Sequence, residues 1–319
     1  MAERSIDRPL TLHKGQVRLE AGYAFSSVTR RFDSDGEVVK LFDEGYTFVR
    51  HAFLVDVRYG ILENLNFTIA STYKAQAERH EEVIVSSTDG QATRLFEIRN
   101  KTGIEDLFVG VTARAPFTSR KVDLIVQGGL YVPLGVNEDS QPHHSVEQID
   151  GGRKLTYRYE SFWGHSDLAV SFGGGAKYRA KFYAFTALVS YDYPLGESKN
   201  LHWTHQLIDD IYEYKSDPYA YQVPANLKFN LEIERQITPW FDLSLLFHGE
   251  QSNGGWQELN GQKYSIATIQ LYSINPGYEI IVTPRLWLRQ RVSIPLWGEN
   301  SESPFSIYTS LVYNFFPFK

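Results

Sequence analysis

Stretches of about ten residues in which apolar and polar side chains alternate recur along this chain from one end to the other. In the first, residues 16–26, one face carries Val17, Leu19, Ala21, Tyr23 and Phe25, and the opposite face is more polar. The last, residues 305–315, alternates in the same way. Successive side chains of a strand point to opposite faces, so this pattern predicts an all-β chain whose strands have one apolar and one polar face.

The connections between these stretches favour a closed barrel over a β-sandwich. Short turns, at residues 62–64, 118–121, 179–181, 238–240 and 283–285, alternate with longer polar connections at 32–45, 80–102, 135–163, 195–224, 252–262 and 298–304. A transmembrane antiparallel up-and-down β-barrel of about twelve strands has this asymmetry, with short periplasmic turns and long extracellular loops. We therefore expect a periplasmic N-terminal segment at residues 1–15 and a single barrel domain at residues 16–319.

An internal repeat supports a barrel built from hairpins. Gly103-Ile104-Glu105-Asp106-Leu107 is echoed by Gly164-His165-Ser166-Asp167-Leu168, and each is followed by a strand, a tight turn, a second strand and Pro-Leu-Gly. Proline has no N–H for the sheet ladder, so it suits the point where a strand leaves the sheet. The repeating unit is therefore a hairpin.

Composition agrees with a bacterial outer-membrane location. The mean hydropathy is -0.33, yet barrel strands average to a polar mean because half of their residues face the lumen. The 20 Tyr, 20 Phe and 6 Trp suit aromatic girdles in contact with outer-membrane lipid and lipopolysaccharide. The chain has no Cys, its one Met is residue 1, and residues 2–4 lack an apolar signal core, as expected of a mature exported sequence. The net charge of -6 argues against a nucleic-acid partner.

The polar faces carry charges of both signs, and the alternation places them inside the barrel. One interpretation is a lattice of salt bridges that satisfies the buried charges and stiffens the barrel. The other is a polar pathway whose charges select solutes. For the second, the candidates to contact an anionic solute are Arg50, Arg58, Arg114, Arg289 and Arg291, each of which could instead pair with a carboxylate. A ligand-stacking role stays open for the inward Tyr131 and Trp287.

Catalytic and metal sites are weakly indicated. His248, Glu250 and Ser252 share a strand face, which suggests acyl transfer. The segment resembles the His-x-Ser-Asn-Gly stretch of outer-membrane phospholipases, but three residues separate His248 from Ser252 where that motif has one. The pair His143-His144 and the acids Asp209, Asp210, Glu213 and Asp217 lack a fixed ligand spacing. We therefore expect no enzyme activity, no metal and no cofactor.

One segment has helical rather than strand spacing. Trp203, Leu207, Ile208, Ile211 and Tyr212 recur at intervals of three to four residues within residues 201–214. The spacing predicts a short helix, either folded into the lumen as a plug or lying on the extracellular surface.

Three short motifs carry a family resemblance. Gly-Ile-Glu-Asp-Leu-Phe-Val-Gly at 103–110, Tyr-Val-Pro-Leu-Gly at 131–135 and Val-Ser-Ile-Pro-Leu at 292–296 resemble the outer-membrane family known as meta-pathway phenol-degradation proteins. Residues 311–315, Leu-Val-Tyr-Asn-Phe, are similar to the aromatic-ending signal read by the barrel assembly machinery. The resemblance covers residues 100–315 and implies passive uptake of small aromatic or otherwise hydrophobic compounds.

The sequence suggests three functions that can be tested. The leading one is an outer-membrane channel for passive uptake of small solutes. The second is a non-conducting barrel whose long loops act in adhesion or partner binding. The third is an outer-membrane lipid hydrolase that uses Ser252.

Overall fold

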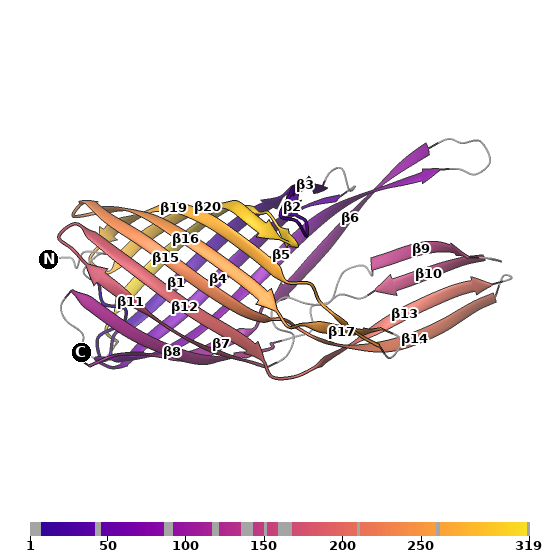
Figure 1. The fold of residues 1–319 in the computed structure, drawn as a ribbon. Helices are drawn as coiled ribbons and strands as arrows, with labels where there is room; N and C mark the ends of the chain where they lie inside the picture. Colours follow the sequence, from indigo (N-terminus) through magenta and orange to yellow (C-terminus); the bar gives the residue numbers. More distant parts are fainter. Residues whose placement is uncertain are drawn as a thin grey trace.

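The protein is a closed barrel of twelve antiparallel strands, seen from the side in Figure 1. This computed structural model describes residues 8–41, 46–85, 92–116, 121–134, 143–149, 152–158, 168–208, 211–259 and 262–317. The barrel strands are β1 (Val17–Val28), β4 (Tyr46–Leu62), β5 (Leu65–Val85), β7 (Leu107–Arg114), β8 (Val122–Val132), β11 (Ala169–Arg179), β12 (Tyr183–Pro194), β15 (Ala225–Thr238), β16 (Phe241–Asn253), β19 (Ile269–Thr283), β20 (Leu286–Glu299) and β22 (Phe305–Phe315). The twelve-stranded barrel predicted from the alternation is confirmed.

Each barrel strand pairs with its neighbours in sequence, and the two ends of the chain close the ring. β1 pairs with β4 on one side and with β22 on the other, so that Val17 lies opposite Phe315 and Ala21 opposite Leu311. Closure leaves no open strand edge in the hydrocarbon, where unpaired N–H and C=O groups could not be satisfied. The hairpins β7–β8 and β11–β12 follow the two copies of the internal repeat.

The two ends of the barrel differ. At the periplasmic end, which also holds both termini (Figure 1), short turns join consecutive strands, such as Glu63-Asn64 between β4 and β5. At the extracellular end, the long connections contain strands of their own: β2 (Arg30–Phe32), β3 (Val38–Lys40) and β21 (Ser301–Glu302) in one small sheet, and β6 (Ala92–Ile104) paired with the outer half of β5. A separate six-stranded sheet holds β9 (His143–Ile149), β10 (Gly152–Arg158), β13 (Ser198–Ile208), β14 (Ile211–Gln222), β17 (Trp256–Leu259) and β18 (Gln262–Ser265). Several of the expected loops therefore contain paired β-structure, and β6, β9, β10, β13 and β14 extend well past the barrel (Figure 1).

The predicted helix at residues 201–214 is wrong. This segment belongs to the hairpin β13–β14, in which Leu207 pairs with Tyr212 and Ile208 with Ile211. Close to a tight turn, the directly paired residues 208 and 211 are three apart and diagonal neighbours such as 207 and 211 are four apart, which imitates helical spacing. Residues 209 and 210 lie outside the described residues.

The two faces of the barrel wall have the predicted polarity. Large apolar side chains are exposed on the outside, among them Val126, with 64% of its surface exposed, and Phe172, with 56%. Tyr23, Phe53, Tyr59, Tyr73, Tyr178 and Tyr193 are exposed on the same face, where aromatic girdles lie in outer-membrane barrels. Charged side chains such as Asp123 and Asp192 are buried inside, at 2% and 1% exposure. Among the residues that the structure describes, no helix has the length and apolar character needed to span a membrane.

Candidate functional site

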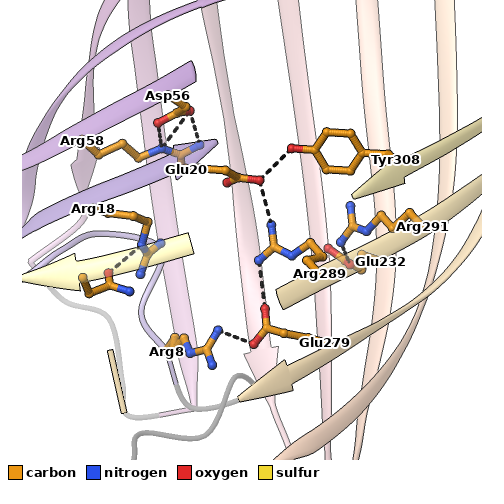
Figure 2. A network of polar contacts seen from close by, with 11 residues as sticks. Arg8, Arg18, Glu20, Asp56, Arg58, Glu232, Glu279, Arg289, Arg291 and Tyr308 are labelled. Atoms are coloured by element: carbon orange, nitrogen blue, oxygen red, sulfur yellow. Dashed lines mark hydrogen bonds and ion pairs between the residues drawn. The ribbon is translucent and has the colours of Figure 1, made fainter. Parts of the chain in front are cut away.

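The lumen contains two layers, a charged layer at the periplasmic end and a cavity above it. Figure 2 shows the charged layer, in which side chains from β1, β4, β15, β19, β20 and β22 point toward one another across the barrel. Strand alternation fixes which residues face inward, while barrel closure brings together residues that are far apart in sequence.

Arg289 lies at the centre of the charged layer. Its Nη2 donates to Glu279 Oε2 at 3.1 Å, and its Nη1 lies 3.8 Å from Glu20 Oε1. The hydroxyl of Tyr308 donates to the same Glu20 carboxylate at 2.8 Å. These contacts join β1, β19, β20 and β22 through one ion pair and two charge-assisted hydrogen bonds, which are stronger than hydrogen bonds between neutral groups.

Two more of the predicted arginines form pairs in this layer (Figure 2). Arg58 donates from Nη2 and Nε to the two oxygens of Asp56, at 2.8 and 3.0 Å, on its own strand. Arg291 donates to Glu232, which belongs to β15, a strand that is not a neighbour of β20. The second pair therefore crosses the lumen.

The remaining two predicted arginines lie away from this centre. Arg50 donates to Gln76 Oε1 at 2.7 Å and to Glu302 Oε2 at 3.3 Å, on the extracellular side. Arg114 lies 3.8 Å from Asp123 Oδ1, near the periplasmic turns. The structure thus brings Arg58, Arg289 and Arg291 together, leaves Arg50 and Arg114 apart, and gives every one of the five a carboxylate neighbour. Their contact with a solute stays a prediction.

The N-terminal segment, residues 8–15, lies inside the periplasmic mouth of the barrel. The backbone N–H of Leu10 donates to Asp123 on β8, and that of Leu12 donates to Asn66 on β5, at 3.1 and 2.9 Å. Thr11 and Leu12 are 1% and 3% exposed. Residues 8–12 therefore fill part of the lumen, while the exposed His13 and Lys14 lie at its rim.

Arg8 ties the same segment to the opposite wall. Its Nη1 lies 2.6 Å from Glu279 Oε1, and its guanidinium carbon is 3.4 Å from the centre of the Trp287 ring. Arg179 donates to the carbonyl oxygen of Arg8 at 3.1 Å. The alternation that identified the other inward arginines does not extend to Arg8, because residue 8 precedes the first strand. Sequence reasoning therefore missed it as a lumen residue.

Above the charged layer the lumen opens into a cavity of about 540 Å³. Its walls combine apolar and aromatic side chains with charged ones, including Leu54, Phe108, Tyr131, Ile269, Lys228 and Glu250. Convergent apolar walls with a few placed polar groups are typical of sites for small organic molecules.

Two glycines make room for the aromatic wall of this cavity. A Cβ atom at Gly110 or at Gly129 would lie 2.5 Å from the ring of Phe108. The ring centres of Phe108 and Tyr131 are 5.0 Å apart. The glycines therefore let a large ring lie flat against the wall, and Tyr131 sits beside it, as its inward parity predicts. Phe108 has the same parity as Arg114, which is the signal that would have found it in the sequence.

Charged residues of the cavity have polar partners in the wall. Lys228 donates to Asp192 Oδ2 at 3.0 Å, and Lys74 forms an ion pair with Glu105. Asn226 donates to the carboxylate of Glu250, which lies 3.7 Å from His248 Nε2. These contacts hold the charged groups against the wall, beside the apolar side chains that a molecule of low polarity would contact.

The acyl-transfer hypothesis gains no geometric support. His248 contacts Asn230 at 2.8 Å and Glu250, while Ser252 is four residues further along the same strand. At about 3.3 Å per residue, that separation is roughly 13 Å along the strand, far beyond the hydrogen bond that a nucleophile and its base need.

The possible cation ligands are not brought together. Among the described side chains, no group of three His, Cys, Asp or Glu could hold a metal ion. The side chains of His143, His144, Glu213 and Asp217, together with residues 209 and 210, lie outside the described residues.

Comparison with solved structures supports the fold. The chain is similar over 96% of its length to the COG4313 outer membrane channel from Pseudomonas putida F1, with 12% identity, 97% coverage of that chain and a TM-score of 0.58. It is also similar to the deltaS2 mutant of the TodX monoaromatic hydrocarbon channel, with 11% identity, 94% and 89% coverage and a TM-score of 0.56. The toluene transporter TodX of Pseudomonas putida matches with 10% identity, 94% and 88% coverage and a TM-score of 0.51.

Sequence comparisons add no family. No protein-family profile and no curated protein sequence matches the chain. The resemblance to the phenol-degradation family therefore stays a prediction. The closed twelve-stranded barrel, its apolar outer face and its structural neighbours make this chain a β-barrel of the bacterial outer membrane.

Proposed function

We propose that this protein is a passive outer-membrane channel for small hydrophobic solutes, including aromatic ones. The observation that carries the proposal is the cavity of about 540 Å³ in the lumen, with Phe108, Tyr131 and Leu54 in its walls. A lumen meant only to stiffen the barrel would be filled by side chains, as it is in the narrowest barrels. This lumen is filled at the periplasmic end and hollow above it.

The structural neighbours support the same class of solute. Two of the structures described above are of one protein, TodX, which is a monoaromatic hydrocarbon channel and toluene transporter. The lipopolysaccharide leaflet slows hydrophobic molecules, so a protein path with apolar walls would give them a faster route. Passive flow needs no cofactor or energy source, and binding in the cavity must be weak enough for release.

The test is entry of a hydrophobic fluorophore, N-phenyl-1-naphthylamine, into whole cells that carry the protein. Ala70 lines the cavity, so Ala70→Trp should fill it and abolish the increase in entry that the wild type gives. The matched control is Val111→Trp, which adds the same side chain on the lipid-facing side, where Val111 is 45% exposed. Equal entry with the wild type and with Ala70→Trp, both folded and at equal abundance, would contradict the proposal.

The extracellular sheet favours adhesion or partner binding as a second candidate. Its six strands stand outside the barrel, and β9 and β18 form its edges, where backbone groups can pair with another chain. Removal of residues 198–222 should then abolish binding of cells to a surface or partner while leaving fluorophore entry unchanged. Loss of fluorophore entry with unchanged binding would instead favour the channel.

A further inference from the structure

Arg18 differs from the other arginines of the charged layer because no carboxylate pairs with it in the described part of the chain. Its hydrogen bond is from Nε to Asn314 Oδ1, at 3.0 Å. Arg8, Arg58 and Arg289 are each paired with a carboxylate. No such partner offsets the charge of Arg18 in the described residues, and an unpaired guanidinium in a buried site favours the approach of an anion.

The side chains around Arg18 present further hydrogen-bond donors without acceptors. In the described residues, Arg8 Nε and Nη2, Trp287 Nε1 and Asn314 Nδ2 are buried and have no hydrogen-bond partner. Arg8, Trp287 and Asn314 are only 7%, 5% and 5% exposed. Buried donors in native proteins normally have partners, so several orphans in one place indicate a missing acceptor.

These donors are connected through direct contacts. The guanidinium carbons of Arg8 and Arg18 lie 3.4 and 5.3 Å from the centre of the Trp287 ring. Asn314 is bonded to Arg18 through its oxygen, which leaves its N–H groups for another partner. The acceptor Glu279 Oε1 is also without a hydrogen bond, but it lies 2.6 Å from Arg8 Nη1 as an ion pair. The donor atoms of Arg8, Trp287 and Asn314 therefore need an acceptor, which an anion would supply.

We propose that Arg18, Arg8, Trp287 and Asn314 form a binding site for the carboxylate of a small organic acid. The fork of a guanidinium matches the two oxygens of a carboxylate, and the indole and amide N–H groups can donate to the same oxygens. That the ligand has a carboxylate is inferred from these donors alone. That the rest of the acid is aromatic or hydrophobic rests on the proposed function.

The test is isothermal titration of the refolded full chain in detergent with benzoate, and with benzamide as the neutral analogue. Arg18→Gln should weaken benzoate binding by at least about tenfold, as expected when a charge-assisted pair is lost. Trp287→Phe keeps the ring and removes its N–H, so it should weaken benzoate by about threefold, the scale of one modest hydrogen bond. Neither substitution should change the affinity for benzamide.

The matched control is Arg235→Gln, which removes an arginine on the exposed face of β15 whose guanidinium lies over the Tyr183 ring. It should leave the benzoate affinity unchanged. Equal benzoate affinities for the wild type and Arg18→Gln, or equal affinities of the wild type for benzoate and benzamide, would overturn the site and mean that water fills it. Fluorophore entry separates this result from the proposed function. Fluorophore entry without benzoate binding would contradict the carboxylate site and leave the channel supported. Benzoate binding without fluorophore entry would contradict the channel and leave the carboxylate site supported.

Discussion

The carbonyl oxygen of His13 occupies the space that a Cβ atom at residue 60 would need. An ideal Cβ on Gly60 would lie under 3.0 Å from this oxygen, closer than real Cβ atoms approach. Two backbone hydrogen bonds hold the contact, from Gly15 N–H to Gly60 O at 2.7 Å and from Gly60 N–H to Gln16 O at 2.9 Å. Gly60 therefore lets the N-terminal segment lie against β4.

Gly60→Ala should loosen this segment, because the new methyl group and the His13 carbonyl cannot both stay in place. The measurement is the rate at which trypsin cleaves after Lys14, which is exposed, and we expect it to rise severalfold. Gly128→Ala is the control, since the nearest atom to a Cβ there is 3.8 Å away. Equal cleavage rates for the two variants would contradict the contact.

Acid should loosen the same segment through Glu63, in the turn between β4 and β5. His13 Nδ1 donates to Glu63 Oε2 at 3.1 Å, and this hydrogen bond lowers the pKa of Glu63 below its ordinary value. A lowered folded-state pKa means that the contact is at full strength above the ordinary carboxyl pKa and is lost as the pH falls through the lowered one. The loss of this contact should change stability only slightly, because both side chains are exposed and solvent screens their attraction.

The chain has no cysteine, so Lys14→Cys gives a single position for a nitroxide label. Its electron paramagnetic resonance spectrum should show a more mobile label below pH 4 than at pH 7. With Glu63→Gln added, the label should be mobile at both pH values. A spectrum that depends on pH equally in both proteins would assign the change to another group.

The cross-lumen pair Glu232–Arg291 should stabilise the barrel more than a surface pair does. Their side chains are 17% and 21% exposed. Glu232→Gln leaves the arginine buried without its carboxylate and should lower the free energy of unfolding by about 1–3 kcal/mol. Adding Arg291→Gln should restore at least half of that loss, because no charge is then left unpaired.

Urea unfolding in lipid vesicles measures these free energies. The control is Glu197→Gln, which removes a pair with Lys263 at 3.5 Å whose side chains are both 55% exposed. It should change stability by less than about 0.5 kcal/mol. Equal losses for Glu232→Gln and Glu197→Gln would show that the lumen is as well hydrated as the surface.

The loss of stability caused by an arginine on the lipid-facing surface should depend on the depth of that arginine in the membrane. Val126 is near the middle of β8, and Ile237 is near the periplasmic end of β15; both are exposed, at 64% and 46%. Val126→Arg should destabilise the barrel by about 2–4 kcal/mol and Ile237→Arg by about 0–1 kcal/mol. The same unfolding measurement checks this order, and a reversed order would contradict the placement of the membrane.

The sequence predicts the barrel well because alternation and turn lengths are local properties. The parity that places Arg289 and Tyr131 inward needs only the residues beside them. It cannot tell which carboxylate ends near which arginine, since Arg291 meets Glu232 across the lumen. For the same reason nothing local separates Arg18, which has no carboxylate partner among the described residues, from the paired Arg58.

Two other features escaped prediction for physical reasons. The hairpin β13–β14 places Ile208 opposite Ile211, and this short separation is the same as one turn of a helix. Arg8 precedes the first strand and has no periodic pattern around it. Its position follows from Glu279 and Trp287, which are brought to it only when the barrel closes.

Single-channel conductance in a planar bilayer tests the central claim most directly, namely that the lumen is a solute pathway narrowed by residues 8–15. The full chain and a chain that lacks residues 1–14 would be compared at equal salt, after both are shown to be folded. We expect a small, steady conductance for the full chain and a severalfold larger conductance for the shortened chain. No conductance from either folded protein, or equal conductance from both, would contradict a solute pathway narrowed by the N-terminal segment.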